Sequence, residues 1–369
     1  MKLDRQQVND LLVGAKIMGT GGGGEVDWAL PLIDEVCDRG KEFVLCDPNE
    51  VADDELVVIV SEVGGGVSEE MKKKVEGYSR IKERPVFVAF QELGRYIGKE
   101  PSAILPAELG AGNTLAAMYV AAMLGKVTID ADGAGRAKPE LSISTTNIKH
   151  VPVTPLCSVT EFGDILFIDK VVDDRRAEDL ARAVANASGG ISGVCRCPMK
   201  GKVMREAVVP NTVTKAIAIG KAIREATAKG KDPVEALLKE VNGVEMFKGK
   251  VASFNREERA AFVWGDFTIA GSGKYQGHDL KVAYKNEHLV SWLDGEPYVT
   301  CPDAICIVDS KGAQGLSNWS NDFQRDREVT VFGVRAHPLW RTERGLQLFG
   351  PRHFGYDVPY VPLERQVSK

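Results

Sequence analysis

The first part of the chain alternates short apolar runs with segments whose apolar residues recur at helical spacing. Helical patterns cover residues 3–18, 25–37, 68–78 and 114–125, with Asn113 expected as the N-cap of the last helix. The runs typical of buried strands are 55–63, 85–93, 102–108 and 126–132. Strands that alternate with helices are typical of a parallel sheet. We therefore predict an α/β domain over residues 1–160.

The pattern changes after Pro152 and Pro155. Residues 174–187 and 211–229 carry apolar residues on one helical face, which predicts two amphipathic helices. From about residue 249 the chain consists of short apolar segments separated by turn residues, which is typical of strands. We therefore expect a second domain, of α+β class, over residues 161–369.

Composition excludes some classes of function. The 369 residues include 47 Lys and Arg and 52 Asp and Glu, giving a net charge of −5, so there is no basic surface to predict nucleic-acid binding. No apolar run is as long as the roughly 18 residues of a membrane span. The charged N-terminus and the seven scattered cysteines indicate a cytoplasmic protein without a disulfide framework. Cys195 and Cys197 are close in sequence, but we favour a structural role for them.

A cluster of glycines lies between the first two predicted helices. Consecutive glycines before a helix offer backbone N–H groups and the positive end of a helix dipole to an oxygen of a ligand. A dinucleotide site is not favoured, because a helix rather than a strand precedes the cluster, so no nucleotide is expected. The predicted ligand-binding residues are Thr20, Gly21, Gly22, Gly23 and Gly24.

Acidic residues lie at or near the predicted carboxyl ends of the strands, where ligands bind in parallel sheets. These acids are Glu62, Glu92, Glu108, Asp130 and Asp132. Carboxylates that converge repel one another, so they require a cation, a shared proton or a hydrogen-bonding substrate. They are candidates for acid–base catalysis, and Asp130, Asp132 and Glu108 are candidate ligands of a divalent metal. Whether a metal is required stays open at this point.

The densest polar stretch runs from residue 130 to residue 140. In a continuous strand, Asp130 and Asp132 would share one face. Arg136 is predicted to orient one of these carboxylates or to bind a substrate carboxylate through its two-pronged guanidinium.

Five motifs together resemble the S-methyl thiohydantoin desulfurase family, and they occur in the same order over nearly the whole chain. They are GTGGGG (19–24), DADGAGRAKPE (130–140), NEHLVSW (286–292), PDAICIVD (302–309) and GPRHFGYD (350–357). The resemblance implies an α/β plus α+β protein. It also implies C–S bond hydrolysis, in which water attacks C2 of an S-methylated thiohydantoin to give a hydantoin and methanethiol. Genes of this family often neighbour hydantoinase and oxoprolinase genes.

For that reaction we expect one group to activate water and others to hold and protonate the ring. The expected catalytic residues are Asp132, Glu140, Arg136 and Glu108. The expected substrate-binding residues, besides the glycine loop, are Asn113, Asn286, Glu287 and Arg352.

Two other functions remain open from the sequence. The chain could be an accessory subunit of a hydantoinase-type or oxoprolinase-type enzyme, or a nucleotide-dependent oxidoreductase that uses the glycine loop. We expect a small heterocyclic substrate, a homo-oligomer, and no nucleic-acid or membrane partner.

Overall fold

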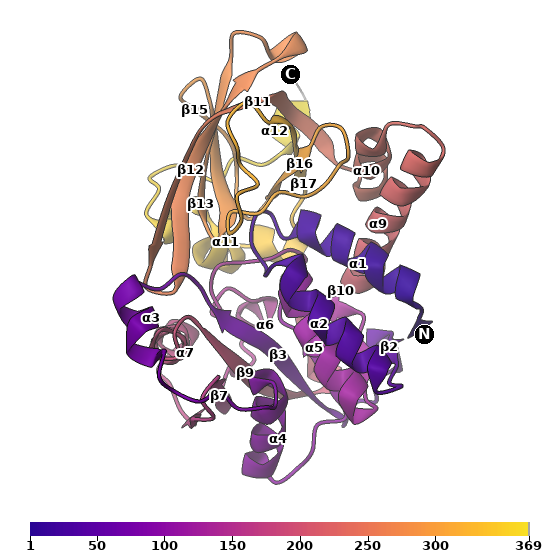
Figure 1. Ribbon diagram of the computed structural model, residues 1–369, viewed down its shortest axis with the longest axis vertical. Helices are drawn as coiled ribbons and strands as arrows, with labels where there is room; N and C mark the ends of the chain where they lie inside the picture. The colour runs from indigo at the N-terminus through magenta and orange to yellow at the C-terminus, as the bar shows by residue number, and fades with distance from the viewer. Residues whose placement is uncertain (368–369) are drawn as a thin grey trace.

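An eight-stranded mixed sheet forms the N-terminal part of the computed structural model, which describes residues 1–367 (Figure 1). Its strands are β1 (Lys2–Leu3), β2 (Phe43–Cys46), β3 (Leu56–Gly64), β4 (Ala103–Pro106), β5 (Val127–Ile129), β7 (Leu156–Thr160), β8 (Ile165–Ile168) and β9 (Ile191–Lys200). They are arranged in the order β1-β2-β5-β4-β3-β9-β7-β8. The central strands β2, β5, β4 and β3 are parallel, and the flanking strands pair antiparallel. The carboxyl ends of β3, β4 and β5 therefore meet at one edge.

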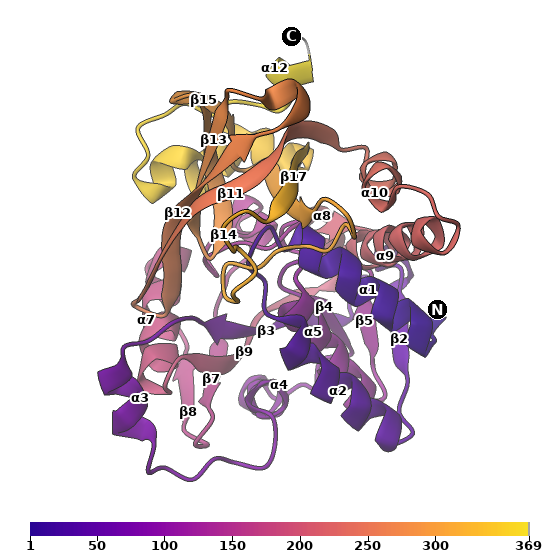
Figure 2. The same cartoon turned by 45° about the horizontal axis from the view of Figure 1, so that its top comes forward.

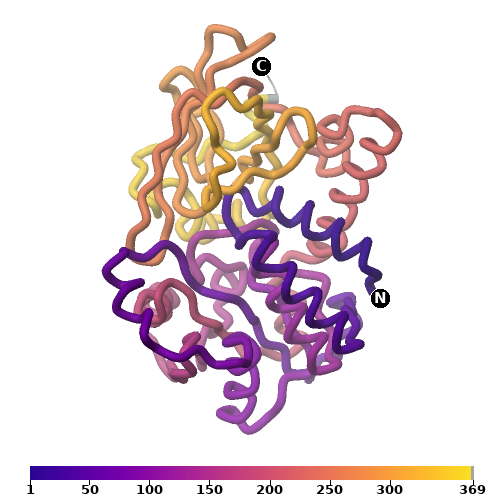
Figure 3. The backbone as a smooth tube through the Cα atoms, viewed as in Figure 1, coloured from indigo at the N-terminus to yellow at the C-terminus, as the bar shows by residue number. Residues whose placement is uncertain are grey.

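Helices cover both faces of this sheet. They are α1 (Arg5–Met18), α2 (Val26–Asp38), α3 (Glu69–Val75), α4 (Pro85–Ile97), α5 (Ala111–Leu124), α6 (Thr145–Ile148), α7 (Asp174–Ala187), α8 (Gly201–Ala207), α9 (Thr212–Ala228) and α10 (Pro233–Val241). Side chains alternate along β3, so Val58 and Val60 face the core with α4 and α5, while Val57 and Ile59 face α8. The backbone trace shows α9 beside α1, far from it in sequence (Figure 3).

A second sheet of seven antiparallel strands lies above the first in Figure 1 and comes forward in Figure 2. Its strands are β11 (Val244–Arg259), β12 (Phe262–Gly271), β13 (Asp279–Lys285), β14 (Glu287–Leu293), β15 (Glu296–Thr300), β16 (Ala304–Asp309) and β17 (Glu328–Val334). Their order is β15-β14-β13-β12-β11-β17-β16. Two further helices, α11 (Glu343–Phe349) and α12 (Glu364–Val367), follow this sheet in the chain. Within the described residues, no helix is long and apolar enough to span a bilayer.

The predicted fold class is confirmed: a first domain with parallel strands and helices precedes a β-rich second domain. The first sheet extends beyond residue 160, because β8 and β9 are hydrogen-bonded within it. Helices α7 and α9 lie where the periodicity predicts them.

The strand predicted over residues 85–93 is wrong, because this segment belongs to helix α4. Its buried residues Val86, Ala89, Phe90 and Leu93 follow helical spacing, and Pro85 occupies the first turn, where its missing N–H costs nothing. Aromatic and β-branched residues suggested a strand, but the burial of one helical face decides the outcome. Glu92 therefore lies on a helix, paired with Arg95, and not at a strand end.

The predicted strand over residues 126–132 is divided. The chain leaves the large sheet after β5, and β6 (Ala131–Asp132) pairs instead with β10 (Val209–Pro210). Asp130 and Asp132 therefore do not share one face of a continuous strand. Asn113 is also not the N-cap that we expected, because α5 begins after Gly110 and Asn113 lies in its first turn.

Candidate functional site

A pocket lies at the carboxyl ends of β3 and β4 and has about 670 Å³ of empty space, including its open mouth. Residues 61–65, at the end of β3, form one wall, and Glu108, after β4, forms another. The second domain contributes Asn286, Glu287 and Trp319. Of the residues predicted from sequence, the structure brings these to the pocket: Gly23, Gly24, Glu62, Glu108, Asn113, Glu140, Asn286 and Glu287.

The glycine loop approaches its neighbours so closely that side chains would not fit. A Cβ atom on Gly22 would lie 2.0 Å from Oε1 of Glu287, and one on Gly23 would lie 2.6 Å from Cα of Gly110. The N–H of Gly23 donates a hydrogen bond of 3.1 Å to Oε1 of Glu287. The sequence predicts that N–H groups of this loop bind an oxygen of a ligand. In the structure, the N–H of Gly23 binds a carboxylate of the chain itself, that of Glu287.

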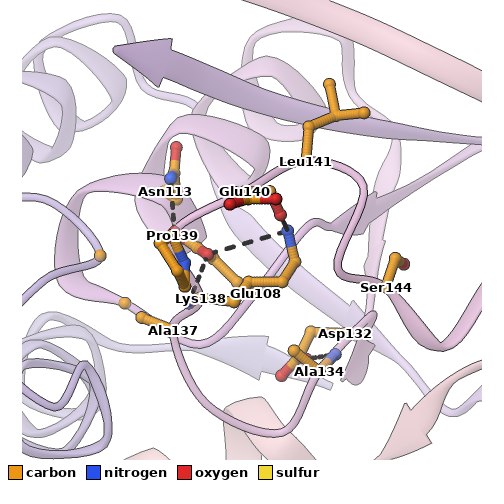
Figure 4. A network of polar contacts seen from close by, with 12 residues as sticks. Glu108, Asn113, Asp132, Ala134, Ala137, Lys138, Pro139, Glu140, Leu141 and Ser144 are labelled. Carbon is orange, nitrogen blue, oxygen red and sulfur yellow. Dashed lines mark hydrogen bonds and ion pairs between the residues drawn. The ribbon is translucent and has the colours of Figure 1, made fainter. Parts of the chain in front are cut away.

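Glu108 belongs to a network with Asn113 and Lys138 (Figure 4). Its Oε1 accepts a 2.7 Å hydrogen bond from Nδ2 of Asn113, and its Oε2 accepts one of 3.0 Å from the backbone N–H of Lys138. The Lys138 ammonium lies 4.0 Å from the same Oε2 and donates to the carbonyl of Glu140 at 3.2 Å. Burial lowers the pKa of Lys138.

Glu140 is fixed by two basic side chains from the second domain. Its Oε1 lies 2.5 Å from Nζ of Lys285, and its Oε2 lies 2.9 Å from Nε2 of His353. Burial alone would raise the pKa of Glu140, but the hydrogen bond from His353 and the charge of Lys285 outweigh it and lower the pKa to about 2. At neutral pH this carboxylate is ionised and already paired, which makes it a poor base for water.

Glu287 is the most deeply buried acid of the pocket. It is 1% exposed, and burial together with the charge of Glu108 raises its pKa well above the usual value. Oε1 accepts the bond from Gly23, whereas Oε2 has no hydrogen-bond partner within residues 1–367. A carboxyl that stays protonated with a free oxygen is suited to donate a proton or a hydrogen bond to a ligand.

Asn286 takes part in the wall rather than pointing freely into the pocket. The backbone of Asn286 has a positive φ of 55°. Its side-chain Oδ1 accepts a 2.8 Å hydrogen bond from the N–H of Val263. Its carbonyl accepts another from Nδ2 of Asn318, also at 2.8 Å. These bonds hold the turn that carries the neighbouring Glu287.

Sequence reasoning missed Arg196, in β9. This side chain is 1% exposed and lines the pocket, yet its guanidinium has no hydrogen-bond or ion-pair partner in the described part of the chain. An unpaired buried charge is costly, so a ligand with an acceptor oxygen or a negative charge fits beside it. A lone arginine between two cysteines inside an apolar strand was the available signal, but the sequence analysis considered only the cysteines and favoured a structural role for them.

Asp132 lies outside the pocket and apart from the Glu108 network (Figure 4). It is fully buried, and its Oδ1 accepts hydrogen bonds from the N–H groups of Ala134 and Gly135 at 2.5 and 2.6 Å. Burial raises its pKa to about 6 in spite of these bonds. The arrangement shapes a tight turn and does not expose the carboxylate to the pocket.

Arg136 also lies outside the pocket and orients no carboxylate. It is buried and donates five hydrogen bonds, to Oγ1 of Thr20 and to the carbonyls of Ala137, His288, Pro302 and Asp303. All its N–H donors are therefore occupied.

Four other predicted binding residues also lie elsewhere. The side chain of Thr20 bonds Arg136, and Gly21 packs against Asn318 and His288. Gly22 is not among the residues that line the pocket but supports Glu287 from behind. Arg352 is 74% exposed and lies near Asp357 in a different surface depression.

The three candidate metal ligands are not brought together. Oδ1 and Oδ2 of Asp130 accept bonds from the N–H and hydroxyl of Thr214, at 3.0 and 2.7 Å, whereas Glu108 and Asp132 have the partners described above. Among residues 1–367, no group of three His, Cys, Asp or Glu side chains is arranged to hold a metal ion.

The fold and the pocket define a two-domain α+β protein with a polar pocket between its domains. More specifically, the chain belongs to the S-Me-THD-like family: the model of its N-terminal domain matches residues 6–170, and that of its C-terminal domain matches residues 172–363. This finding confirms the family predicted from the motifs.

A crystal structure of a protein from Chromobacterium violaceum has the same fold. It has a TM-score of 0.81 and 23% sequence identity, over 98% of this chain and 100% of that chain. At this identity the likeness establishes the fold alone. Among curated proteins, no match was found.

Proposed function

We propose that this protein hydrolyses the C–S bond of a small S-methyl thiohydantoin-like ring, giving a hydantoin and a thiol. The observation that carries the proposal is a pocket between the domains that holds a buried carboxyl with one unbonded oxygen, Oε2 of Glu287, together with the guanidinium of Arg196, which has no hydrogen-bond or ion-pair partner in the described residues. The family name points to the same type of substrate.

Two parts of the reaction have a matching group in the pocket. Glu287 donates a proton or hydrogen bond to a ring nitrogen, which makes C2 more electrophilic. Arg196 binds an acceptor oxygen of the substrate, either the ring carbonyl or a carboxylate on its substituent. Glu108 and Asn113 position the Lys138 backbone and close the floor of the pocket.

The test is release of methanethiol from an S-methyl thiohydantoin by the purified protein, followed with a thiol reagent. We expect wild-type protein to release one thiol per hydantoin formed, and Glu287→Gln to lower turnover by about 10²–10⁴-fold, the usual worth of a positioned acid. A chelator-treated sample, assayed in parallel, tests whether a metal is needed. Absence of thiol release from wild-type protein under all these conditions would contradict the proposal and favour the accessory-subunit alternative.

A further inference from the structure

Glu62 is a further acid that lines the pocket. It lies near the end of β3, where its backbone N–H donates a 2.8 Å hydrogen bond to Oδ1 of Asn113. The same Asn113 donates to Glu108 through its other side-chain atom, so one amide aligns the two acidic residues. Across the sheet, the residue paired with Glu62 is Gly193, where the backbone of Pro85 and Val86 at the start of α4 packs too closely for any side chain.

The four acids that line the pocket differ in the partners of their carboxyl groups. Glu108 is bonded by Asn113 and Lys138, Glu140 is paired with Lys285 and His353, and one oxygen of Glu287 is bonded by Gly23. The carboxyl of Glu62 is half-buried and has no hydrogen-bond or ion-pair partner in the part of the chain that the structure describes. It is therefore free to exchange a proton with a ligand.

The charges around Glu62 are few. Burial raises its pKa to about 7, the positive charge of Arg84 just before α4 opposes this rise, and the negative charge of Glu161 after β7 adds to it. The residue of α5 that contacts Glu62 is the neutral Asn113, which accepts a hydrogen bond from the backbone N–H of Glu62. An acid with a pKa near neutrality can both accept and return a proton within one catalytic cycle.

We propose that Glu62 is a catalytic residue that accepts a proton from the attacking water and passes it to the leaving sulfur. This proposal rests on the proposed hydrolase function. It separates the two carboxyls by role, with Glu62 serving the water and the thiol while Glu287 serves the ring nitrogen.

The steps balance when each proton is followed. In the addition step, the water oxygen bonds to C2, one water proton moves to the Glu62 carboxylate, and the C2=N electron pair moves to the ring nitrogen, which takes the proton of Glu287. In the elimination step, the C2–S bond breaks with its electron pair on sulfur, and Glu62 returns its proton to the sulfur. The hydroxyl proton on C2 passes to Glu287 as the C2=O bond forms. Both carboxyls are thereby restored.

The experiment measures methanethiol release from an S-methyl thiohydantoin against pH for wild-type protein, Glu62→Gln and Glu62→Asp. For wild-type protein we expect kcat/KM to fall as the pH drops below about 7, because the base must be ionised. Glu62→Gln should lower kcat by about 10²–10⁴-fold with KM within about threefold, and should lack this limb of the pH profile. Glu62→Asp keeps a carboxylate and should retain both the limb and part of the activity.

Glu92→Gln is the matched control, since Glu92 is an acid on nearby α4 that lies outside the pocket, and it should behave like wild-type. Glu62→Gln with wild-type kcat and an unchanged pH profile would overturn the role of Glu62 and leave the hydrolase function standing. Inactive wild-type protein would overturn the function and this role together. If Glu62→Gln does not fold, a wild-type profile that is flat between pH 5 and 8, or an inactive folded Glu62→Asp, would overturn the proposal.

Discussion

Two buried arginines, in two regions of the molecule, differ in whether the protein supplies their hydrogen-bond partners. At the junction between the domains, Arg136 donates five hydrogen bonds to groups of both domains. In the pocket, Arg196 is equally buried but has no partner among residues 1–367. The two side chains thus have the same burial and charge, but only one of them is satisfied by the protein itself.

The presence or absence of partners within the protein distinguishes a buried charged side chain that stabilises the fold from one that is available to bind a ligand. A buried charge with all its donors occupied stabilises the arrangement around it, because removing it leaves several polar groups unpaired. A buried charge without partners costs stability in the free protein and gains its partner from a ligand. We therefore expect substitutions in the two regions to act on different quantities, stability in the first and substrate affinity in the second.

The largest expected effect is that of Arg136→Met at the junction. The substitution leaves the carbonyls of His288 and Asp303 and the hydroxyl of Thr20 without their donors. The free energy of unfolding should fall by about 3–5 kcal/mol, as measured by urea or thermal unfolding. A loss below about 1 kcal/mol would show that the junction does not depend on this guanidinium.

Arg196→Met should act on binding instead. We expect KM to rise by about 10–100-fold, the worth of a hydrogen bond to a charged group of about 1.5–3 kcal/mol, while the free energy of unfolding stays the same or increases. Arg182→Met is the control, since Arg182 also lines the pocket but bonds Glu178 and the carbonyl of Gly64, so it should lose stability. Loss of stability in Arg196→Met with an unchanged KM would contradict the distinction between the two regions.

Asp132→Asn should have the smallest effect on turnover, although Asp132 was one of the catalytic residues expected from the sequence. An asparagine oxygen can still accept the bonds from Ala134 and Gly135. Because the pKa of Asp132 is raised to about 6 in the folded protein, ionisation opposes folding, and wild-type stability falls as the pH rises from about 4 through 6. The difference from the ordinary pKa corresponds to about 3 kcal/mol at pH 7, so the variant should be more stable than wild-type there by up to that amount and no more stable below pH 4.

Turnover of Asp132→Asn should remain within about fivefold of wild-type, because the side chain lies outside the pocket. Thiol-release kinetics and unfolding at two pH values check both statements. A loss of turnover of a hundredfold or more would restore Asp132 as the catalytic base.

Periodicity predicted the fold well where one face of an element is buried. The helix expected over residues 174–187 is the observed α7, and the β-rich region begins at β11, close to where the turn residues indicate. The same reasoning failed for α4, because the choice between strand and helix there depends on which side chains the first sheet buries. Short apolar segments do not contain that information.

The site was predicted in part for a similar reason. Glu108, Glu140 and Glu287 belong to the pocket because motifs near strand ends meet there. Asp132 and Arg136 do not, because the chain leaves the large sheet after β5, which no local pattern indicates. Arg196 was missed because only the pairing of β9 with β3 brings it to the end of the parallel strands.

The hydrogen bond from Gly23 to Glu287 joins residues 264 positions apart in the chain. During synthesis on the ribosome, the glycine loop is therefore made long before Glu287. Strand β3 is likewise made before β9, the strand with which it pairs. A nascent chain that has completed only the first sheet has one wall of the pocket and lacks Asn286, Glu287 and Trp319. Ligand binding thus becomes available late in translation, and a product truncated before β14 should have no active pocket.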